Sequence, residues 1–307
     1  MTALAPAPAP VKTQGLANLI CMASMMVWAI GLPAADMLIG PVPPLPLTAA
    51  RMAMAAACLL PLWWLMEGTA PLKAAAWIKG TLIGGSTIGM GAFMLVVGQG
   101  MTSAVTVAVI SASMPVIGIA IEVILDGRRL TPGLVVGVIL SLIGGLMALG
   151  EADGGLALGL GAVLCFGSVV TFTIGSRLTV TSFPHLTPMG RTTVTLTGAA
   201  LATCGAAAVN HVLGGAAPDW AVLGWPEFGA LALFSVGGLA ISQVLWIMSV
   251  GSLGIALASL HINAAPFYVM ILLFAMGGAW NWMQALGALV VGVGVLVAQG
   301  IIPLGRR

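Results

Sequence analysis

A small set of polar and aromatic side chains lies inside long apolar runs, where such groups usually serve a purpose. His261 can donate or accept a hydrogen bond and can gain or lose a proton near neutral pH. Gln243 offers an amide donor and an acceptor, and Trp246 follows it by three residues, on one face of a helix. Tyr268 shares a face with His261 in the same way. These groups could bind a small polar molecule, and His261 could carry a proton.

Further candidates lie at similar depth in other apolar runs. Ser24 and Trp28 are four residues apart on the first run, and a central Trp needs a partner for its indole N–H. Each candidate also has a structural alternative. Serines often bond to their own helix, His261 could be neutral and bonded to a neighbouring helix, and Asn263 could support a backbone weakened by a nearby proline. The predicted cavity is formed by Ser24, Trp28, Ser111, Gln243, Trp246, His261, Asn263 and Tyr268.

Two prolines lie within apolar runs that are otherwise helical in pattern. Pro115 and Pro266 each lack a backbone donor and leave a carbonyl unpaired. We expect a helix break at each proline. The freed carbonyls could face a cavity, or the prolines could simply bend their helices.

The charged residues are expected near the helix ends. Arg51 should pair with Asp36 or extend to the headgroups, with gating as the alternative. Glu122 and Asp126 should pair with Arg128 or Arg129, with proton coupling by Glu122 as the alternative. No carboxylate is expected at mid-membrane, which weakens proton coupling and leaves facilitated diffusion open. The absence of a central Arg or Lys argues against strongly anionic substrates.

Enzyme chemistry finds little support in the sequence. There is no HExxH, GxSxG or nucleotide-binding Walker motif, and the chain has three His in all. The four Cys lie in apolar runs and form no CxxC pair, which favours packing roles. We therefore predict no catalytic residues, no metal and no cofactor. The net charge of +2 is not gathered in a basic patch, so no nucleic-acid partner is expected.

Composition places the protein in a lipid bilayer. Hydrophobic residues make up 60% of the chain, charged residues 6%, and the mean hydropathy is +1.14. Apolar runs of about 20 residues span a bilayer as helices. An Ala-Pro segment, 1–14, is expected to be a disordered tail, and 304–307 a second tail. We predict an all-α membrane protein with ten helices, at 15–39, 45–66, 77–98, 101–123, 131–149, 155–177, 186–209, 226–249, 252–276 and 282–303.

The chain contains a diverged internal repeat. Gly100 and Pro115 have the same separation as Gly251 and Pro266. The triplet Gly137, Gly144 and Gly150 matches the triplet Gly287, Gly294 and Gly300. A segment at 47–51 also resembles 186–191, each ending in Arg. We predict two five-helix repeats, 15–150 and 151–303, in a monomer with its site between them.

Lys and Arg placement predicts the topology. With a cytoplasmic N-terminus, the basic residues outside the apolar runs fall at cytoplasmic ends, and the opposite connections hold none. Both termini are then cytoplasmic. An odd number of helices per half inverts the second repeat relative to the first. Inverted repeats are typical of alternating access around a mid-membrane site.

Several motifs resemble one known family, over about 15–303. They are Met25-Met26-Val27-Trp28, Leu47 to Arg51, Ser113-Met114-Pro115, Asp126 to Leu130, and the glycine run from Gly137 to Gly145. The pattern resembles the drug/metabolite transporter superfamily, EamA type, most closely bacterial amino-acid exporters of the YddG kind. Gly277-Gly278-Ala279 departs from the pattern, because Asp126-Gly127-Arg128 occupies the matching place in the first half.

The resemblance implies a function and a site. It implies a cavity lined by helices 1, 3, 4, 6, 8 and 9, and a secondary transporter that exports small metabolites such as amino acids. Its partners would be that small-molecule substrate and the lipid of the bacterial inner membrane. Other metabolites or drugs are the alternative cargo. An integral-membrane enzyme or a channel is the alternative class.

Overall fold

The computed structural model describes residues 11–101, 110–149, 159–218, 223–275, 277 and 279–303. Within these ranges the regular structure is helical, apart from a single bridge between Ile39 and Val42. Five helices are long and apolar enough to cross a bilayer. They are Pro44–Glu67, Trp77–Gly100, Leu160–Ser182, Pro188–Val212 and Trp225–Leu253. Together with the composition, these helices identify a multi-pass membrane protein.

The helices follow the predicted order closely. The first part of the chain forms α1 (Val11–Asp36), α2 (Pro44–Glu67), α3 (Thr69–Ala74), α4 (Trp77–Ile83), η1 (Gly84–Gly89), α5 (Met90–Gly100), α7 (Met114–Asp126) and α8 (Pro132–Leu149). The second part forms α9 (Leu160–Ser182), α10 (Pro188–Val212), α11 (Trp225–Ala232), η3 (Leu233–Ile241), α12 (Ser242–Leu253), α13 (Ile255–Ser259), η4 (Leu260–Ala264), α14 (Ala265–Ala275) and α15 (Trp282–Ala298).

Some boundaries differ from the expected ones for local reasons. α1 begins at Val11, inside the segment expected to be a tail, because no proline follows Pro10 until Pro33. The short helix α3 was not predicted, since the sequence suggested a simple break there. Gly68, with φ of 77°, ends α2 and turns the chain directly into α3. Residues 1–10 and 304–307 lie outside the described residues.

The two prolines begin helices instead of bending them in the middle. Pro115 lies in the first turn of α7, after a turn at Ala112 and Ser113. Pro266 is the second residue of α14, directly after the 3-10 segment η4. A proline is well tolerated in the first helical turn, where its missing N–H costs no bond. The expected breaks are therefore present at both places, although the side chain of Pro266 is outside the description.

Two further segments depart from regular α-helix. The helical stretches that begin at Trp77 and Trp225 contain the π-helical segments η1 and η3. In a π-helix each backbone hydrogen bond joins residues five apart in the sequence, where an α-helix joins residues four apart. Such segments often occur at functional sites. Both lie beside the cavity described below.

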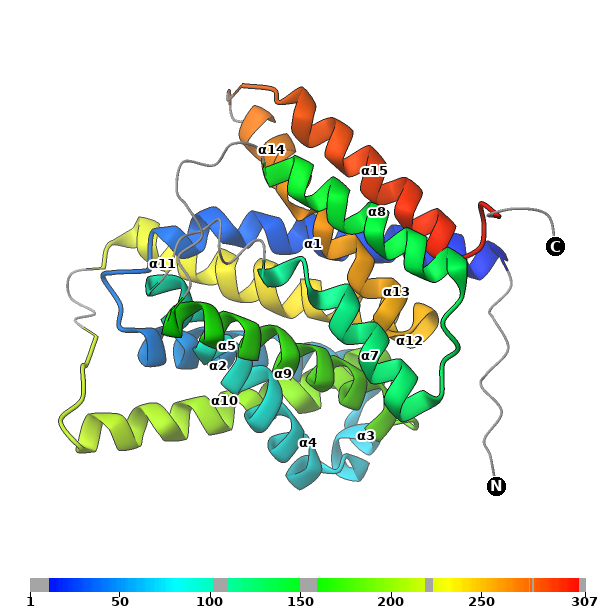
Figure 1. Cartoon of the computed structure of the whole chain (residues 1–307). Helices are drawn as coiled ribbons and strands as arrows, with labels where there is room; N and C mark the ends of the chain where they lie inside the picture. Colours follow the sequence, from blue (N-terminus) through cyan, green and yellow to red (C-terminus); the bar gives the residue numbers. More distant parts are fainter. Residues whose placement is uncertain are drawn as a thin grey trace.

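Glycines allow α8 and α15 to pack closely against each other. α8 and α15 run side by side, as Figure 1 shows. A Cβ atom on Gly137 would lie 2.4 Å from the carbonyl oxygen of Gly294, and one on Gly144 would lie 2.5 Å from that of Gly287. The pairing is antiparallel, because the earlier glycine of α8 meets the later one of α15. Small residues at such contacts are typical of helix packing in lipid.

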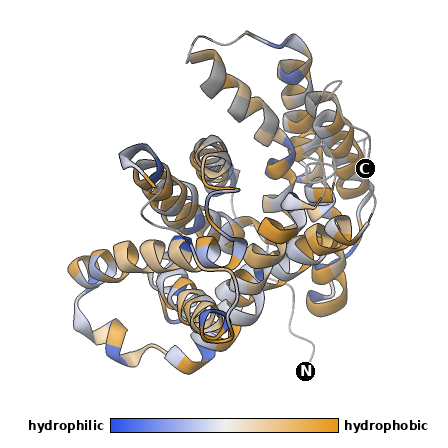
Figure 2. Ribbon diagram, turned by 90° about the vertical axis from the view of Figure 1, so that its left-hand side faces the viewer, coloured by the Kyte–Doolittle hydropathy of each residue, from blue (hydrophilic) through white to orange (hydrophobic). Residues whose placement is uncertain are grey.

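Large apolar side chains also cover the outside of the bundle. Ile78, Leu65 and Val212 are among the most exposed. Figure 2 shows hydrophobic residues along most of the ribbons, with many of the hydrophilic ones near helix ends. An apolar exterior of this kind is stable in a bilayer and would be costly in water.

Candidate functional site

A cavity lies in the middle of the bundle, where helices from both parts of the chain meet. Its empty volume is about 900 Å³, which includes space open to the surroundings. Its lining comes from α1, α2, η1, α5, α7, α9, η3, α12 and η4, together with Ser111. The lining residues are Ser24, Met25, Trp28, Arg51, Met52, Ile88, Gly91, Ala92, Leu95, Ser111, Met114, Ser168, Val169, Phe172, Gly238, Leu239, Ser242, Gln243, Trp246 and Ile262.

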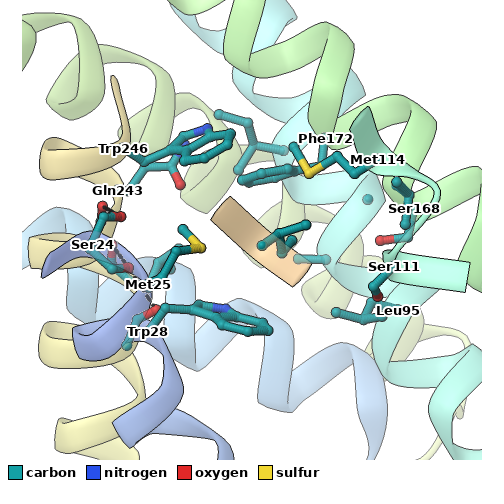
Figure 3. A pocket seen from close by; sticks show the side chains of 18 of the residues that line it. Ser24, Met25, Trp28, Leu95, Ser111, Met114, Ser168, Phe172, Gln243 and Trp246 are labelled. Atoms are coloured by element: carbon teal, nitrogen blue, oxygen red, sulfur yellow. Dashed lines mark hydrogen bonds between the residues drawn. The ribbon is translucent and has the colours of Figure 1, made fainter. Parts of the chain in front are cut away.

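Aromatic and thioether side chains form much of the cavity wall. Trp246 stacks on Phe172, with ring centroids 6.2 Å apart and planes inclined by 29°. Its indole N–H donates to Ser176 Oγ at 2.9 Å, on the side away from the cavity lining. Figure 3 shows the indole rings of Trp246 and Trp28 at two edges of the cavity, with Met25 between them in that view. These walls suit the apolar part of a ligand.

The polar groups of the cavity come from several helices. Gln243 is buried, and its Nε2 has no hydrogen-bond partner among the described residues. Ser24 Oγ donates to the carbonyl of Ser242 at 2.7 Å, so this hydroxyl ties α1 to α12. In Figure 3, Ser111 and Ser168 lie on the side of the cavity opposite Ser24 and Gln243. A buried amide donor without a partner is costly unless a ligand or water satisfies it.

Arg51 was expected near the surface but lines the cavity. The side chain is buried, at 8% exposure, so the expected extension to the headgroups is wrong. Its Nε donates to the carbonyl of Phe234 and its Nη2 to that of Gly238, both at 3.4 Å, and its guanidinium lies 3.7 Å from the centre of the Phe234 ring. The π-helical segment η3 supplies all three contacts. The expected pairing with Asp36 involves a side chain outside the described part.

The predicted cavity residues divide into two groups. Ser24, Trp28, Ser111, Gln243 and Trp246 line the central cavity. His261, Asn263 and Tyr268 do not appear in its lining. Ile262 does, and neighbouring positions of a helix point about 100–120° apart. The backbone of η4 therefore turns Ile262 inward and His261 away.

His261 and Tyr268 line a second cavity instead. It has an empty volume of about 1120 Å³ and lies between α1, η4, α14 and α15. His261 Nδ1 lies 3.2 Å from the carbonyl of Ala258. At one side of the cavity, the amides of Asn18 and Gln299 bond reciprocally, at 2.8 and 2.7 Å. Its rim includes the exposed residues Met22 and Leu289, so it opens on the apolar exterior.

Asn263 belongs to neither cavity lining. Its Nδ2 donates to Ser141 Oγ at 3.0 Å, and Ser141 in turn donates to the carbonyl of Leu260. These bonds hold η4 against α8. Asn263 therefore makes a structural contact, but with Ser141 and not with the backbone near Pro266 that the sequence suggested.

Sequence reasoning missed several lining residues on α9. Ser168 and Phe172 are four residues apart and both face the cavity. Their spacing on a helix was visible in the sequence, but Thr171, Thr173 and Ser176 place polar groups at other angles around the same helix, so no single polar side stands out. A hydrophobic pattern of this kind does not separate a cavity face from a lipid face.

Charged residues gather at one end of the bundle, which we call the basic end (Lys79, Arg128, Arg177 and Arg191). Here the buried carboxylate of Glu122 forms an ion pair with Arg128, as expected. Its other oxygen accepts the backbone N–H of Ala256 at 3.0 Å, at the start of α13. Asp126 pairs with Arg177 of α9, not with Arg128 or Arg129. Both pairs close the space between α7 and its neighbours at this end.

Trp246→Phe tests how firmly the aromatic wall is held. The variant keeps an aromatic ring against Phe172 but leaves Ser176 Oγ without its donor. We expect the free energy of unfolding to fall by about 1 kcal/mol. Thermal denaturation in detergent measures this change. Ser176→Ala should cost at least as much, because it leaves the indole N–H unpaired, and an unchanged melting temperature in both variants would contradict the prediction.

Comparisons with known proteins agree with this picture at the level of family and fold. Residues 15–150 match the EamA-like transporter family, which confirms the EamA-type resemblance over the first part of the chain, while the likeness to YddG-type exporters stays a prediction. No curated protein matches the sequence. Among the solved structures, 25 chains match. One, described only as "Crystal structure of protein", has a TM-score of 0.74 at 23% sequence identity, and the similarity covers 92% of this chain and 96% of that chain. This likeness shows a shared fold.

Proposed function

We propose that this chain is a secondary transporter of the drug/metabolite transporter superfamily that exports small metabolites, amino acids foremost, across a bacterial inner membrane. The observation that carries the proposal is the central cavity. It combines apolar walls at Trp28, Phe172 and Trp246 with the unpaired amide donor of Gln243. The EamA match of residues 15–150 supports transport as the function, and the resemblance to bacterial amino-acid exporters suggests the cargo.

The proposal includes two inverted five-helix repeats. Gly144 is the repeat counterpart of Gly294, and Gly137 is that of Gly287. Gly144 contacts Gly287, and Gly137 contacts Gly294. If each glycine is replaced by its repeat counterpart, the first contact becomes the second. This exchange is what a two-fold axis between the halves requires.

A second helix pair supports the same axis. Cys204 Sγ of α10 points to the carbonyl of Ala49 on α2, and a Cβ on Gly190 of α10 would lie 2.8 Å from the Trp63 ring of α2. When α2 and α10 are aligned so that Arg51 matches Arg191, the first contact falls within one residue of the counterpart of the second. The π-helical segments η1 and η3 begin seven and eight residues after Trp77 and Trp225, again at matching places.

Alternating access follows from this arrangement. In the proposed topology the basic end faces the cytoplasm, as the placement of Lys and Arg favours. The cavity lies between the repeats, so rocking of one repeat against the other would expose it to each side in turn. The described lining contains no carboxylate. Substrate flux would therefore follow the substrate's own gradient unless another residue carries protons.

Transport in liposomes tests this function. Purified protein should accumulate radiolabelled amino acids by counterflow when unlabelled amino acid fills the vesicles, and saturation would separate a carrier from a channel. Comparison with and without an imposed pH gradient shows whether protons are coupled. Folded protein that moves no amino acid would contradict the amino-acid assignment and move the cargo to other metabolites or drugs.

Matched variants then locate the site. Trp28→Ala removes a wall of the central cavity and is expected to lower counterflow roughly tenfold, because a buried aromatic contact contributes about 1.5–3 kcal/mol. His261→Ala changes the second cavity and should leave counterflow within about twofold, although sequence reasoning placed both residues together. A larger loss in His261→Ala than in Trp28→Ala would contradict the central cavity as the substrate site.

A further inference from the structure

The central cavity contains one fixed charge among its described lining residues, the guanidinium of Arg51. We infer that Arg51 and Gln243 bind the carboxylate of a substrate with a single negative charge and an apolar body. This inference rests on the proposed function and names the chemical class of its substrate. The sequence suggested no central Arg or Lys, whereas Arg51 lines the cavity and allows a substrate with one negative charge.

The contacts of Arg51 leave donors for a ligand. A guanidinium has five N–H groups in a rigid fork. The described acceptors are two backbone carbonyls, one for Nε and one for Nη2, each at the long distance of 3.4 Å. No carboxylate with a described side chain lies within ion-pair distance of Arg51. The guanidinium is thus oriented by η3 but only weakly satisfied by it.

A second donor belongs to the same cavity. Gln243 is 4% exposed, and its amide nitrogen has no partner among the described residues. It lies on α12, which directly continues η3, and η3 supplies the Gly238 carbonyl that helps to orient Arg51. A carboxylate has two oxygens and can accept from a guanidinium and an amide together. It would satisfy both groups at once.

The rest of the lining limits the charge of the ligand. Besides Arg51, the described walls are neutral and largely apolar, with Trp28, Phe172 and Met114 among them. A single carboxylate balances a single guanidinium. A dianion such as a phosphate ester would bring a second charge that these walls cannot compensate, and burying an unpaired charge is costly. The walls suit an aliphatic or aromatic side chain instead.

Arg51 also connects α2 to η3, so a purely structural role predicts a different result. Loss of a structural contact lowers stability and affects every ligand alike. Loss of a carboxylate-binding group changes the preference between ligands that differ only in charge. The test is therefore a comparison of ligand pairs in matched variants.

The experiment measures binding of 3-phenylpropanoate and 3-phenylpropanamide, which differ only in the charge at one end, to the purified full-length protein by calorimetry. We expect wild type to prefer the carboxylate by roughly tenfold or more, as charge-assisted hydrogen bonds usually give. In Arg51→Gln this preference should fall to within about threefold. Arg51→Lys should lie between the two, because an ammonium keeps the charge and loses the fork. If Arg51→Gln does not fold, Arg51→Lys carries the comparison.

Arg191→Gln is the matched control. Arg191 is the repeat counterpart of Arg51 and also bonds two backbone carbonyls, those of Phe183 and Pro184, but it lies outside the cavity lining. Its loss should leave the ligand preference unchanged. An unchanged preference in the folded Arg51 variants would overturn the inference, as would a wild type that binds neither ligand or shows no preference for the carboxylate.

Counterflow with the same proteins separates this inference from the proposed function. Arg51-dependent binding without any flux would contradict transport and keep the carboxylate site. Flux in Arg51→Gln with undiminished preference for the carboxylate would keep transport and remove Arg51 from the site.

Discussion

Gly144→Leu is expected to prevent formation of a stable folded protein. The position faces α15 so closely that even a Cβ atom would lie 2.5 Å from the carbonyl oxygen of Gly287 and 2.7 Å from the backbone nitrogen of Val291. Backbone atoms on a helix cannot move aside as a flexible side chain can. The larger side chain must therefore separate α8 from α15, with the loss of the packing along both helices.

Two alanine variants on this helix pair should change the free energy of unfolding in opposite directions or by clearly different amounts. Gly144→Ala should lower the free energy of unfolding by about 1–3 kcal/mol, as overpacking does. Gly292→Ala, on α15, meets nothing within 4 Å. It should leave stability unchanged or raise it by up to about 1 kcal/mol, because Ala favours helix over Gly. Denaturation in mixed micelles measures both.

The repeat provides a further comparison for this interface. In the proposed repeat Gly294 is the counterpart of Gly144, and a Cβ there would lie 2.7 Å from the carbonyl oxygen of Gly137. Gly294→Ala should therefore cost about as much as Gly144→Ala. Equal stability of the Gly144, Gly294 and Gly292 alanine variants would show that the close backbone contact between α8 and α15 does not contribute to the stability of the protein.

The helices were predictable because lipid imposes a simple rule on them. A run of about 20 apolar residues must satisfy its own backbone, so its length and ends are visible in hydropathy, Gly and Pro. The predicted 45–66 became Pro44–Glu67, and 77–98 became Trp77–Gly100. Local irregularities were less visible. Neither π-helical segment has a sequence signal as clear as the proline that follows η4.

The cavity was harder to predict, because depth along a helix does not determine direction around it. In this protein the lipid-facing and protein-facing sides are both apolar. Gln243 and Trp246 were correctly placed on one cavity-facing side. His261 was not, since the 3-10 segment η4 changes the angle between successive residues. Arg51 was judged by its closeness to a helix end, whereas η3 supplies carbonyls that hold it inside.

The contact of Glu122 with α13 leads to the second large effect that we expect. One carboxylate oxygen accepts the N–H of Ala256, and the other pairs with Arg128, so α7 is tied to the start of α13 at the basic end. In the proposed topology this contact closes the cytoplasmic side of the cavity. Glu122→Ala should weaken that closure, because a hydrogen bond to a charged group contributes about 1.5–3 kcal/mol. The population open at this end should rise about 10-fold to 100-fold.

Cysteine labelling measures the opening. Ser259, the last residue of α13, is buried and faces Gly118 of α7. A cysteine placed there, with the four native cysteines replaced, should therefore react slowly with a water-soluble maleimide. In the Glu122→Ala background the labelling rate should rise with the open population. Glu122→Gln keeps an acceptor for the Ala256 N–H and should give a smaller increase.

Asp126→Asn is the control for charge alone. It lies on the same helix, but its carboxylate is 44% exposed in its pair with Arg177, and exposed pairs contribute about 0–1 kcal/mol. It should change labelling little. In the proposed repeat, Gly277-Gly278-Ala279 occupies the place of Asp126-Gly127-Arg128. The end of the bundle opposite the basic end therefore lacks a matching charged segment. A labelling rate in Glu122→Ala no higher than in Asp126→Asn would exclude Glu122 as the group that holds the basic end closed in the proposed transport cycle.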